Sequence, residues 1–224
     1  MSRPRALDLF CCAGGAGMGL HRAGFEVVGV DIKPQPRYPF EFHQADALTF
    51  PTDGFDFIWA SPPCQAHTHM SNRYVGKGGL RDSRIDLIPQ TRDRLETAKV
   101  PFVIENVVGA KNVLRLPFRL TGEMFGLGVH RPRLFEASFT VLTPAAKPRQ
   151  KRPIAVYGAM DGRRLWSRVD GSELRAPRSI EEPAAAMGID WMEWDELTQA
   201  IPPAYSEFIG REALRQINLA RLAA

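Results

Sequence analysis

Short apolar runs alternate with stretches of helical periodicity in the first half of the chain, and this pattern constrains the fold most strongly. Four runs have the length and the apolar character of buried parallel strands: 6–10, 27–31, 55–60 and 101–106. Helical patterns occur at 18–23 and 91–98. Because strands that alternate with helices build βαβ units, the sequence predicts an α/β protein with a mainly parallel, doubly wound sheet.

The remainder of the chain changes character. A stretch rich in proline, glycine and arginine at 140–177 predicts loops around one or two short strands. Ser179 and Glu182 have the spacing of a capping box ahead of a helix at 184–187. Apolar residues at helical intervals over 205–222 predict a last helix that packs back on the sheet.

Composition excludes several classes of protein. The chain has 224 residues, of which 44% are hydrophobic and 24% charged, so a mainly disordered chain is excluded and one domain with a small appendage is expected. No apolar run approaches the roughly 18 residues that cross a bilayer, and the first ten residues lack a signal-peptide core, which predicts a cytosolic protein without a membrane partner. Three cysteines and five histidines without metal-ligand spacing predict neither a disulfide framework nor a metal site.

The net charge of +4 is weak support for a polyanionic partner. Six arginines and lysines against one glutamate at 131–152 suit phosphate contacts, although a solvated basic loop explains them equally well.

Polar residues follow the expected strands at the edge where such sheets bind ligands. Asp8 and Phe10 lead into a glycine-rich turn with Gly14 and Gly15, where the backbone can approach a ligand closely. Asp31 ends the second strand, where a carboxylate accepts hydrogen bonds from a ribose diol. An adenine amino group is the corresponding partner for Asp46. Each aspartate is alternatively a turn or cap residue.

Two further strand ends carry reactive groups. Cys64 stands in a proline-stiffened loop after the third strand, where an accessible thiolate is a nucleophile, although most cysteines are small buried hydrophobes. Glu105 ends the fourth strand, where burial raises a carboxyl pKa and makes it a proton donor, unless a salt bridge holds it ionised.

In this order, the motifs resemble the cytosine-C5 DNA methyltransferase family. Asp8-Leu9-Phe10 with the following glycines is similar to the family's turn that binds S-adenosyl-L-methionine (AdoMet), Pro63-Cys64-Gln65 to its catalytic loop, and Glu105-Asn106-Val107 to its glutamate motif. Asp82-Ser83-Arg84 and Arg131-Pro132-Arg133 are similar to its Asp-x-Arg element and its arginine pair. The resemblance implies a Rossmann-like AdoMet-dependent methyltransferase fold with a small C-terminal appendage.

The resemblance also implies the site residues. The catalytic set is Cys64, Glu105, Arg131 and Arg133. The cofactor AdoMet is expected at Asp8, Phe10, Gly14, Gly15, Asp31, Ile32, Asp46, Ala47 and Pro62. Substrate contacts are expected at Pro63, Gln65, Asn106 and Arg84.

The chemistry implied by the resemblance is methyl transfer to cytosine C5. Cys64 adds to C6, Glu105 donates a proton or a hydrogen bond at N3, and Arg133 donates to the base O2. The activated C5 then attacks the methyl group of AdoMet. Because stacking covers C6 in a duplex, the DNA must present a flipped or single-stranded cytosine.

The chain departs from the family's pattern at several points. Cys12 stands where the family has a glycine, Val129 where it has a glutamine, and two histidines follow the catalytic loop. These histidines, His67 and His69, contact phosphate or substrate, or are exposed loop residues without a role.

The region between the arginine pair and the C-terminal end is short compared with the family. The expected layout is an AdoMet-binding catalytic domain at 1–138, a reduced target-recognition or substrate-contact region at 139–178, and C-terminal helices at 179–224. This layout predicts a compact, phage-like enzyme of low sequence specificity in a bacterial or phage-infected cell, with the basic stretch 149–164 left to hold the DNA backbone.

Three alternatives remain open at this point. The acceptor is single-stranded DNA or a cytosine nucleotide, or the donor is a modified AdoMet. A separate protein supplies target recognition, or the chain itself is a non-catalytic DNA- or partner-binding accessory protein. In the third alternative, the chain is a nucleotide-binding α/β protein with another activity, because a fold does not determine a function.

Overall fold

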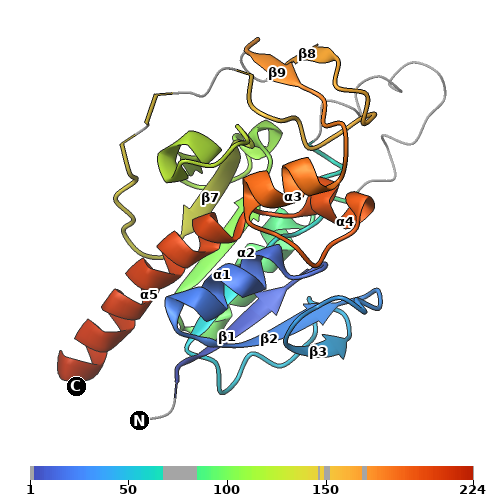
Figure 1. Cartoon of the computed structure of the whole chain (residues 1–224). Helices are drawn as coiled ribbons and strands as arrows, with labels where there is room; N and C mark the ends of the chain where they lie inside the picture. Colours follow the sequence, from blue (N-terminus) through green and yellow to red (C-terminus); the bar gives the residue numbers. More distant parts are fainter. Residues whose placement is uncertain (1–2, 68–84, 146, 149–151, 168–170, 224) are drawn as a thin grey trace.

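The computed structural model of the chain describes residues 3–67, 85–145, 147–148, 152–167 and 171–223. Its centre is a seven-stranded sheet of order β3-β2-β1-β4-β5-β7-β6 (Figure 1). The strands are β1 (Arg5–Leu9), β2 (Glu26–Asp31), β3 (Glu41–Gln44), β4 (Phe57–Ala60), β5 (Phe102–Asn106), β6 (Phe118–Leu120) and β7 (Arg133–Ala137). The first five pair in parallel, whereas β7 is antiparallel to both of its neighbours. The predicted mainly parallel α/β sheet is confirmed.

The chain proceeds from β1 outward to β3 and then returns to the other side of β1 with β4. The strand order therefore reverses between β1 and β4, and the crevice beyond the carboxyl ends of these two strands is the expected ligand site of such a sheet.

Helices cover both faces of the sheet (Figure 1). One face packs against α1 (Gly15–Ala23) and α5 (Pro203–Ala223), with Trp59 and Tyr205 among the largest buried side chains. The other face packs against α2 (Ile88–Ala98). Helices α1 and α5 lie so close that a Cβ on Gly19 would stand 2.1 Å from the Pro203 carbonyl oxygen. The last helix packs on the sheet as the sequence predicts.

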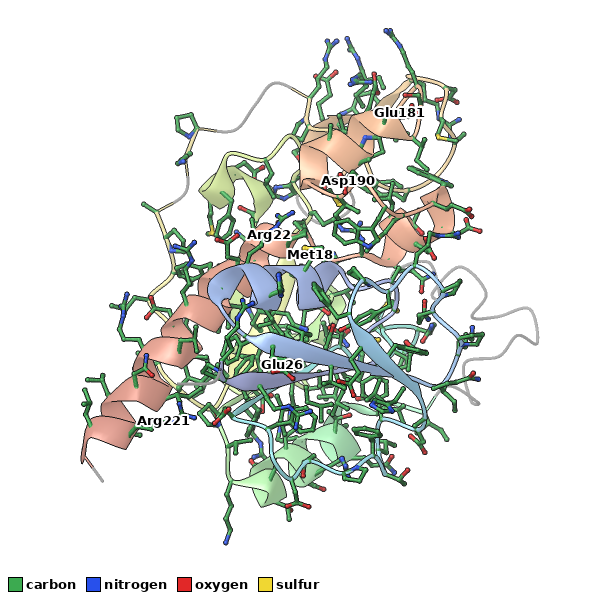
Figure 2. The ribbon with its side chains drawn as sticks, turned by 60° about the horizontal axis from the view of Figure 1, so that its bottom comes forward. Met18, Arg22, Glu26, Glu181, Asp190 and Arg221 are labelled. Carbon is green, nitrogen blue, oxygen red and sulfur yellow. The ribbon has the colours of Figure 1, made fainter. Side chains whose placement is uncertain are left out.

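A further layer lies over the strand ends. It contains α3 (Glu181–Met187), α4 (Trp194–Gln199) and the hairpin of β8 (Arg164–Trp166) with β9 (Glu173–Arg175). Glu181 and Asp190 mark this layer in Figure 2, well away from Arg221 at the far end of α5. The hairpin confirms the prediction of one or two short strands. Single 3-10 turns at Val108–Ala110 (η3) and Gly122–Phe125 (η4) complete the described elements.

The predicted capping box of Ser179 and Glu182 is wrong. Helix α3 starts after Ile180, without a side-chain cap. The Glu182 carboxylate instead accepts hydrogen bonds from Arg175 Nη1, at 2.6 Å, and from the backbone N–H of Arg178. The Arg175 guanidinium takes the Glu182 carboxylate away from the helix start, because a hydrogen bond between two charged groups is stronger than a neutral one. The capping box in this layer belongs to α4, between Glu193 and Glu196.

Among the residues that the structure describes, no helix is long and apolar enough to cross a bilayer.

Candidate active site

A cavity of about 410 Å³ opens at the carboxyl ends of β1, β2, β4 and β5. This volume lies within the 300–1,000 Å³ of small-molecule sites. Its walls come from the glycine-rich turn, the loop after β4, the ends of β2 and β5, and the segment from Met192 to Ile201. The position agrees with the strand-order reversal described above.

Asp31 stands at one side of this cavity, at the end of β2. Its Oδ2 accepts the backbone N–H of Cys12 at 3.0 Å, and its Oδ1 accepts that of Lys33 at 3.0 Å. These bonds fix the plane of the carboxylate, and each oxygen keeps a lone pair for a further donor. Ile32 is 69% exposed beside it, and Phe10 lines the same wall. An acidic group between two apolar side chains suits a nucleoside.

Asp8 lines the cavity from the end of β1 and is completely buried. The Tyr38 hydroxyl donates to its Oδ2 at 3.2 Å. Its Oδ1 is buried and has no hydrogen-bond partner among the described residues. Burial raises the pKa of Asp8 well above its usual value, against the hydrogen bonds from Tyr38 and the Gly17 backbone. A buried polar atom without a partner beside a cavity is where a ligand donor fits.

Several residues expected at the cofactor are not brought to this cavity. Gly14 has a φ of 85° and packs against Tyr38 and Pro39, where a Cβ would lie 2.8 Å from the Pro39 Cδ. Asp46 is exposed, and its Oδ1 accepts the Leu48 N–H at 2.9 Å, which is the alternative role of a turn residue. Ala47 is buried in the core on the α2 side. None of the three is among the lining residues, whereas Gly15 and Pro62 are.

The loop after β4 presents Cys64, half-buried, to the cavity. Hydrogen bonds hold this loop: the Asn106 side-chain amide donates to the Pro62 carbonyl at 2.9 Å, and the His67 N–H donates to the Cys64 carbonyl at 2.9 Å. Asn106 is thereby used to position the loop. Pro63 and Gln65 line the cavity on either side of the thiol.

The surroundings of Cys64 favour the protonated form of its thiol. Burial raises the pKa of Cys64, the Glu105 carboxyl raises it further, and the Arg133 guanidinium lowers it. Formation of the thiolate is therefore favoured by the positive charge of Arg133 or by a proton acceptor on the substrate.

Glu105 lines the same cavity from the end of β5 and is 6% exposed. Its Oε1 lies 3.0 Å from Arg133 Nε. Burial raises the pKa of Glu105, while Arg133 and Ser61 act in the opposite direction. The structure thus brings a thiol, a carboxyl of raised pKa and a guanidinium to one wall of a single cavity.

Arg131 is placed differently from the sequence expectation. Its guanidinium donates to the carbonyl oxygens of Ala200 at 2.8 Å and Thr198 at 2.7 Å, with a longer contact of 3.4 Å to that of Leu197. It does not line the cavity. Its backbone φ is 34°, in the left-handed region. The structure thus gives Arg131 a role in holding the C-terminal segment, and its expected catalytic contact stays a prediction.

His67 is not the exposed loop histidine that the sequence allows. Its side chain is 11% exposed, and its Nε2 lies 3.1 Å from Asp86 Oδ1. Its carbonyl packs against Gly109, where a Cβ would lie 2.0 Å from it. His69 and Arg84 lie outside the described residues. Within the part of the chain that the structure describes, no group of three or more acidic, cysteine or histidine side chains could hold a metal ion.

The sequence did not indicate one wall of the cavity. Met192, Glu196 and Gln199 reach it from α4 and the loop before it. Arg37 ties this wall to the β2–β3 connection, because its Nε lies 2.7 Å from Glu196. The Trp191 indole N–H donates to the Ala13 carbonyl at 2.8 Å. The Arg37–Glu196 pair joins residues about 160 positions apart, so no local sequence pattern indicates it. A tryptophan and an acidic start of the α4 helix were the local features that could have pointed to this wall.

Comparisons with known proteins agree with this arrangement. Residues 5–114 match the model of the C-5 cytosine-specific DNA methylase family. The Type II methyltransferase M.XorII of Xanthomonas oryzae pv. oryzae is 30% identical over 129 residues, which are 49% of this chain. The chain spans 29% of the length of that curated relative.

Solved structures show the same fold. A prophage-encoded protein of E. coli, described as a DNA modification methyltransferase, has a TM-score of 0.60 at 14% identity, over 96% of this chain and 99% of that one. The Dnmt2 methyltransferase of S. pombe has a TM-score of 0.59 at 14% identity, over 97% and 100%. With the strand-end motifs of residues 5–114 assembled on this fold, the chain is similar over that range to the C-5 cytosine-specific DNA methylase family.

Proposed function

We propose that the protein transfers a methyl group from AdoMet to C5 of cytosine in DNA, through a covalent bond between Cys64 and C6. One observation carries the proposal: Cys64 and Glu105 reach a single cavity from neighbouring strand ends, and that cavity continues to Asp31. A nucleophile, an acid and a nucleoside-sized compartment are what the reaction requires.

The residues present fit AdoMet. Asp31 would accept from the ribose hydroxyls, and Phe10 and Ile32 would contact the adenine. The buried Oδ1 of Asp8 has no partner among the described residues and offers an acceptor for the charged amino group of the methionine moiety. When bound, AdoMet supplies an electrophilic methyl group.

The chain's own residues activate the base. After its thiol proton has passed to a base, the Cys64 thiolate bonds to C6 while N3 accepts a proton or a hydrogen bond from Glu105, so that the electron density moves to C5. Arg133 holds Glu105 and can donate to the base O2. When a base such as water removes the C5 proton, the C5–C6 double bond forms again and the Cys64–C6 bond breaks. The thiolate is restored, and N3 returns to Glu105 any proton it had accepted.

We further propose that the DNA-contact region is the short segment 139–178, with low sequence specificity. Its hairpin carries Trp166, 58% exposed, next to Arg163 and Arg164, whose side chains are also more than half exposed. Exposed arginines and an aromatic ring bind phosphates and unstacked bases without reading base edges. A two-stranded hairpin leaves little surface for direct readout, which also favours single-stranded DNA as a second candidate acceptor.

The test is a methylation assay with nucleoside mass spectrometry on duplex DNA, single-stranded DNA and dCMP, each with AdoMet. The expected product is 5-methylcytosine from DNA, and product from dCMP alone would overturn the DNA substrate. DNA that carries 5-fluorocytosine should trap wild-type protein as a covalent adduct, because the fluorine cannot leave as the C5 proton does. Cys64→Ser should form no adduct while still binding AdoMet by calorimetry, and an adduct with this variant would exclude Cys64 as the nucleophile.

A further inference from the structure

Trp59 and Ser61 follow each other on one face at the end of β4. Parallel pairing of β4 with β5 sets Trp59 beside Val103 and Ala60 beside Ile104. Continued by one residue, this register brings Ser61 beside Glu105. Because side chains alternate between faces, Trp59, Ser61 and Glu105 lie on the same side of the sheet.

The hydrogen bond between Trp59 and Ser61 can run in only one direction. The Trp59 indole N–H lies 2.9 Å from Ser61 Oγ, and an indole can only donate. Trp59 is completely buried in the core, so this donor cannot turn away. A serine hydroxyl has a single proton, and because its oxygen already accepts from the indole, that proton is left for an acceptor such as the neighbouring Glu105 carboxyl, whose pKa Ser61 lowers.

Arg133 supplies a second donor to the same carboxyl, with Nε 3.0 Å from Oε1. Both donors approach from protein groups, and both require a carboxyl lone pair that carries no proton. A proton on Glu105 must therefore occupy one of the remaining lone pairs. Since Glu105 lines the cavity, the remaining lone pairs are those available to a bound base.

We propose that Ser61 is a positioning residue which, held by Trp59, orients the Glu105 carboxyl so that its acidic proton faces the cavity. The proposal rests on the proposed function, in which Glu105 acts as the acid at N3. Without the Ser61 donor, the proton of Glu105 can also settle on the lone pair that Ser61 vacates. For part of the time, the Glu105 proton then points away from the cytosine.

Ser61→Ala should have two effects. Methylation should slow by roughly tenfold or more, a part of the 10²–10⁴ that a positioned acid contributes. The titration of Glu105 should move to higher pH, because the Ser61 hydrogen bond lowers its pKa in the wild type. The limb of the pH–rate profile that reports loss of this proton should move in the same direction.

The decisive measurement does not depend on activity. The Glu105 carboxyl is titrated by ¹³C NMR of glutamate-labelled protein and assigned with Glu105→Gln. Ser61→Ala should move that titration upward, Ser61→Thr should restore it, and Trp59→Phe should move it upward by less, because the freed hydroxyl still donates for part of the time. A Ser61→Ala protein in which Glu105 titrates as in the wild type would overturn the proposal.

The matched control is Ser138→Ala. The Ser138 hydroxyl bonds to the Phe102 backbone at the opposite end of β5, with the Phe102 N–H 2.8 Å from its Oγ. This variant loses a comparable serine hydrogen bond on the same strand and should leave both the Glu105 titration and the pH–rate profile in place. If wild type methylates no cytosine substrate while the titration shift occurs, the proposed function fails and the positioning by Ser61 stands.

Discussion

Replacement of Arg131 by methionine tests whether this arginine holds the C-terminal wall of the cavity. Two short hydrogen bonds, of 2.8 Å to the Ala200 carbonyl and 2.7 Å to the Thr198 carbonyl, would be lost. Bonds to charged groups contribute about 1.5–3 kcal/mol each, or about 3–6 kcal/mol together. Methionine avoids the cost of burying a charge, which offsets a part of this sum.

The expected loss of unfolding free energy is therefore about 2–4 kcal/mol for Arg131→Met, or roughly 4–16 °C in Tm for a chain of this size. Urea titration followed by circular dichroism measures it. Arg131→Lys should lie in between, since lysine keeps the charge but lacks the planar fork. Arg211→Met is the control: Arg211 makes an exposed pair with Glu207 on α5, and its loss should change stability by less than about 1 kcal/mol.

Function separates this structural role from a catalytic one. The segment that Arg131 holds lines the cavity, so Arg131→Met should weaken AdoMet binding, while adduct formation with 5-fluorocytosine DNA should recover at saturating AdoMet. A variant as stable as the wild type that binds AdoMet normally and yet forms no adduct would refute this reasoning. Arg131 would then act on the substrate directly.

Three further predictions concern the surroundings of the cavity. Arg92→Met should destabilise the protein by about 3–5 kcal/mol in urea titration, because the buried Glu136 carboxylate, 2.6 Å away, loses its charge partner and among the described residues keeps only the Arg115 backbone N–H. An unchanged midpoint would mean that the pair is not buried in solution. Gly109→Ala should lower methylation at least tenfold with little loss of AdoMet binding, since its Cβ would lie 2.0 Å from a carbonyl oxygen of the catalytic loop, a displacement of the kind that costs about 10²-fold; full activity would show that the loop adapts. Alkylation of Cys64 by iodoacetamide, in a Cys12→Ser background, should keep accelerating above pH 9.0, because burial raises the pKa of the thiol. Glu105→Gln should speed the alkylation at any lower pH, because the Glu105 carboxyl also raises that pKa. A slower alkylation in this variant would contradict the effect of Glu105 on Cys64.

The sequence was sufficient for the parts of the fold that rest on local pattern. The four apolar runs became β1, β2, β4 and β5 within two residues of their expected bounds, since a buried parallel strand shows as a continuous apolar run. The edge strand β3 was missed because most of its residues are exposed and polar. Strand β7 was missed because its direction, antiparallel to β5, depends on partners far away in the chain.

The same division holds for the site. Motif order alone indicated Cys64, Glu105, Asp8 and Asp31, and the strand ends bring all four to one cavity. These residues follow directly from strands, so the common edge of a parallel sheet assembles them once the strands are known.

Tertiary structure decided the remaining roles. Arg131 and Arg133 are two residues apart and read alike in the sequence, yet one holds carbonyl oxygens of the C-terminal segment and the other holds Glu105. Likewise, only the β4–β5 register sets Ser61 beside Glu105. A sequence specifies which side chains stand at strand ends. The partners of these side chains depend on packing between segments that are distant in the chain, and local sequence patterns do not show which distant segments pack together.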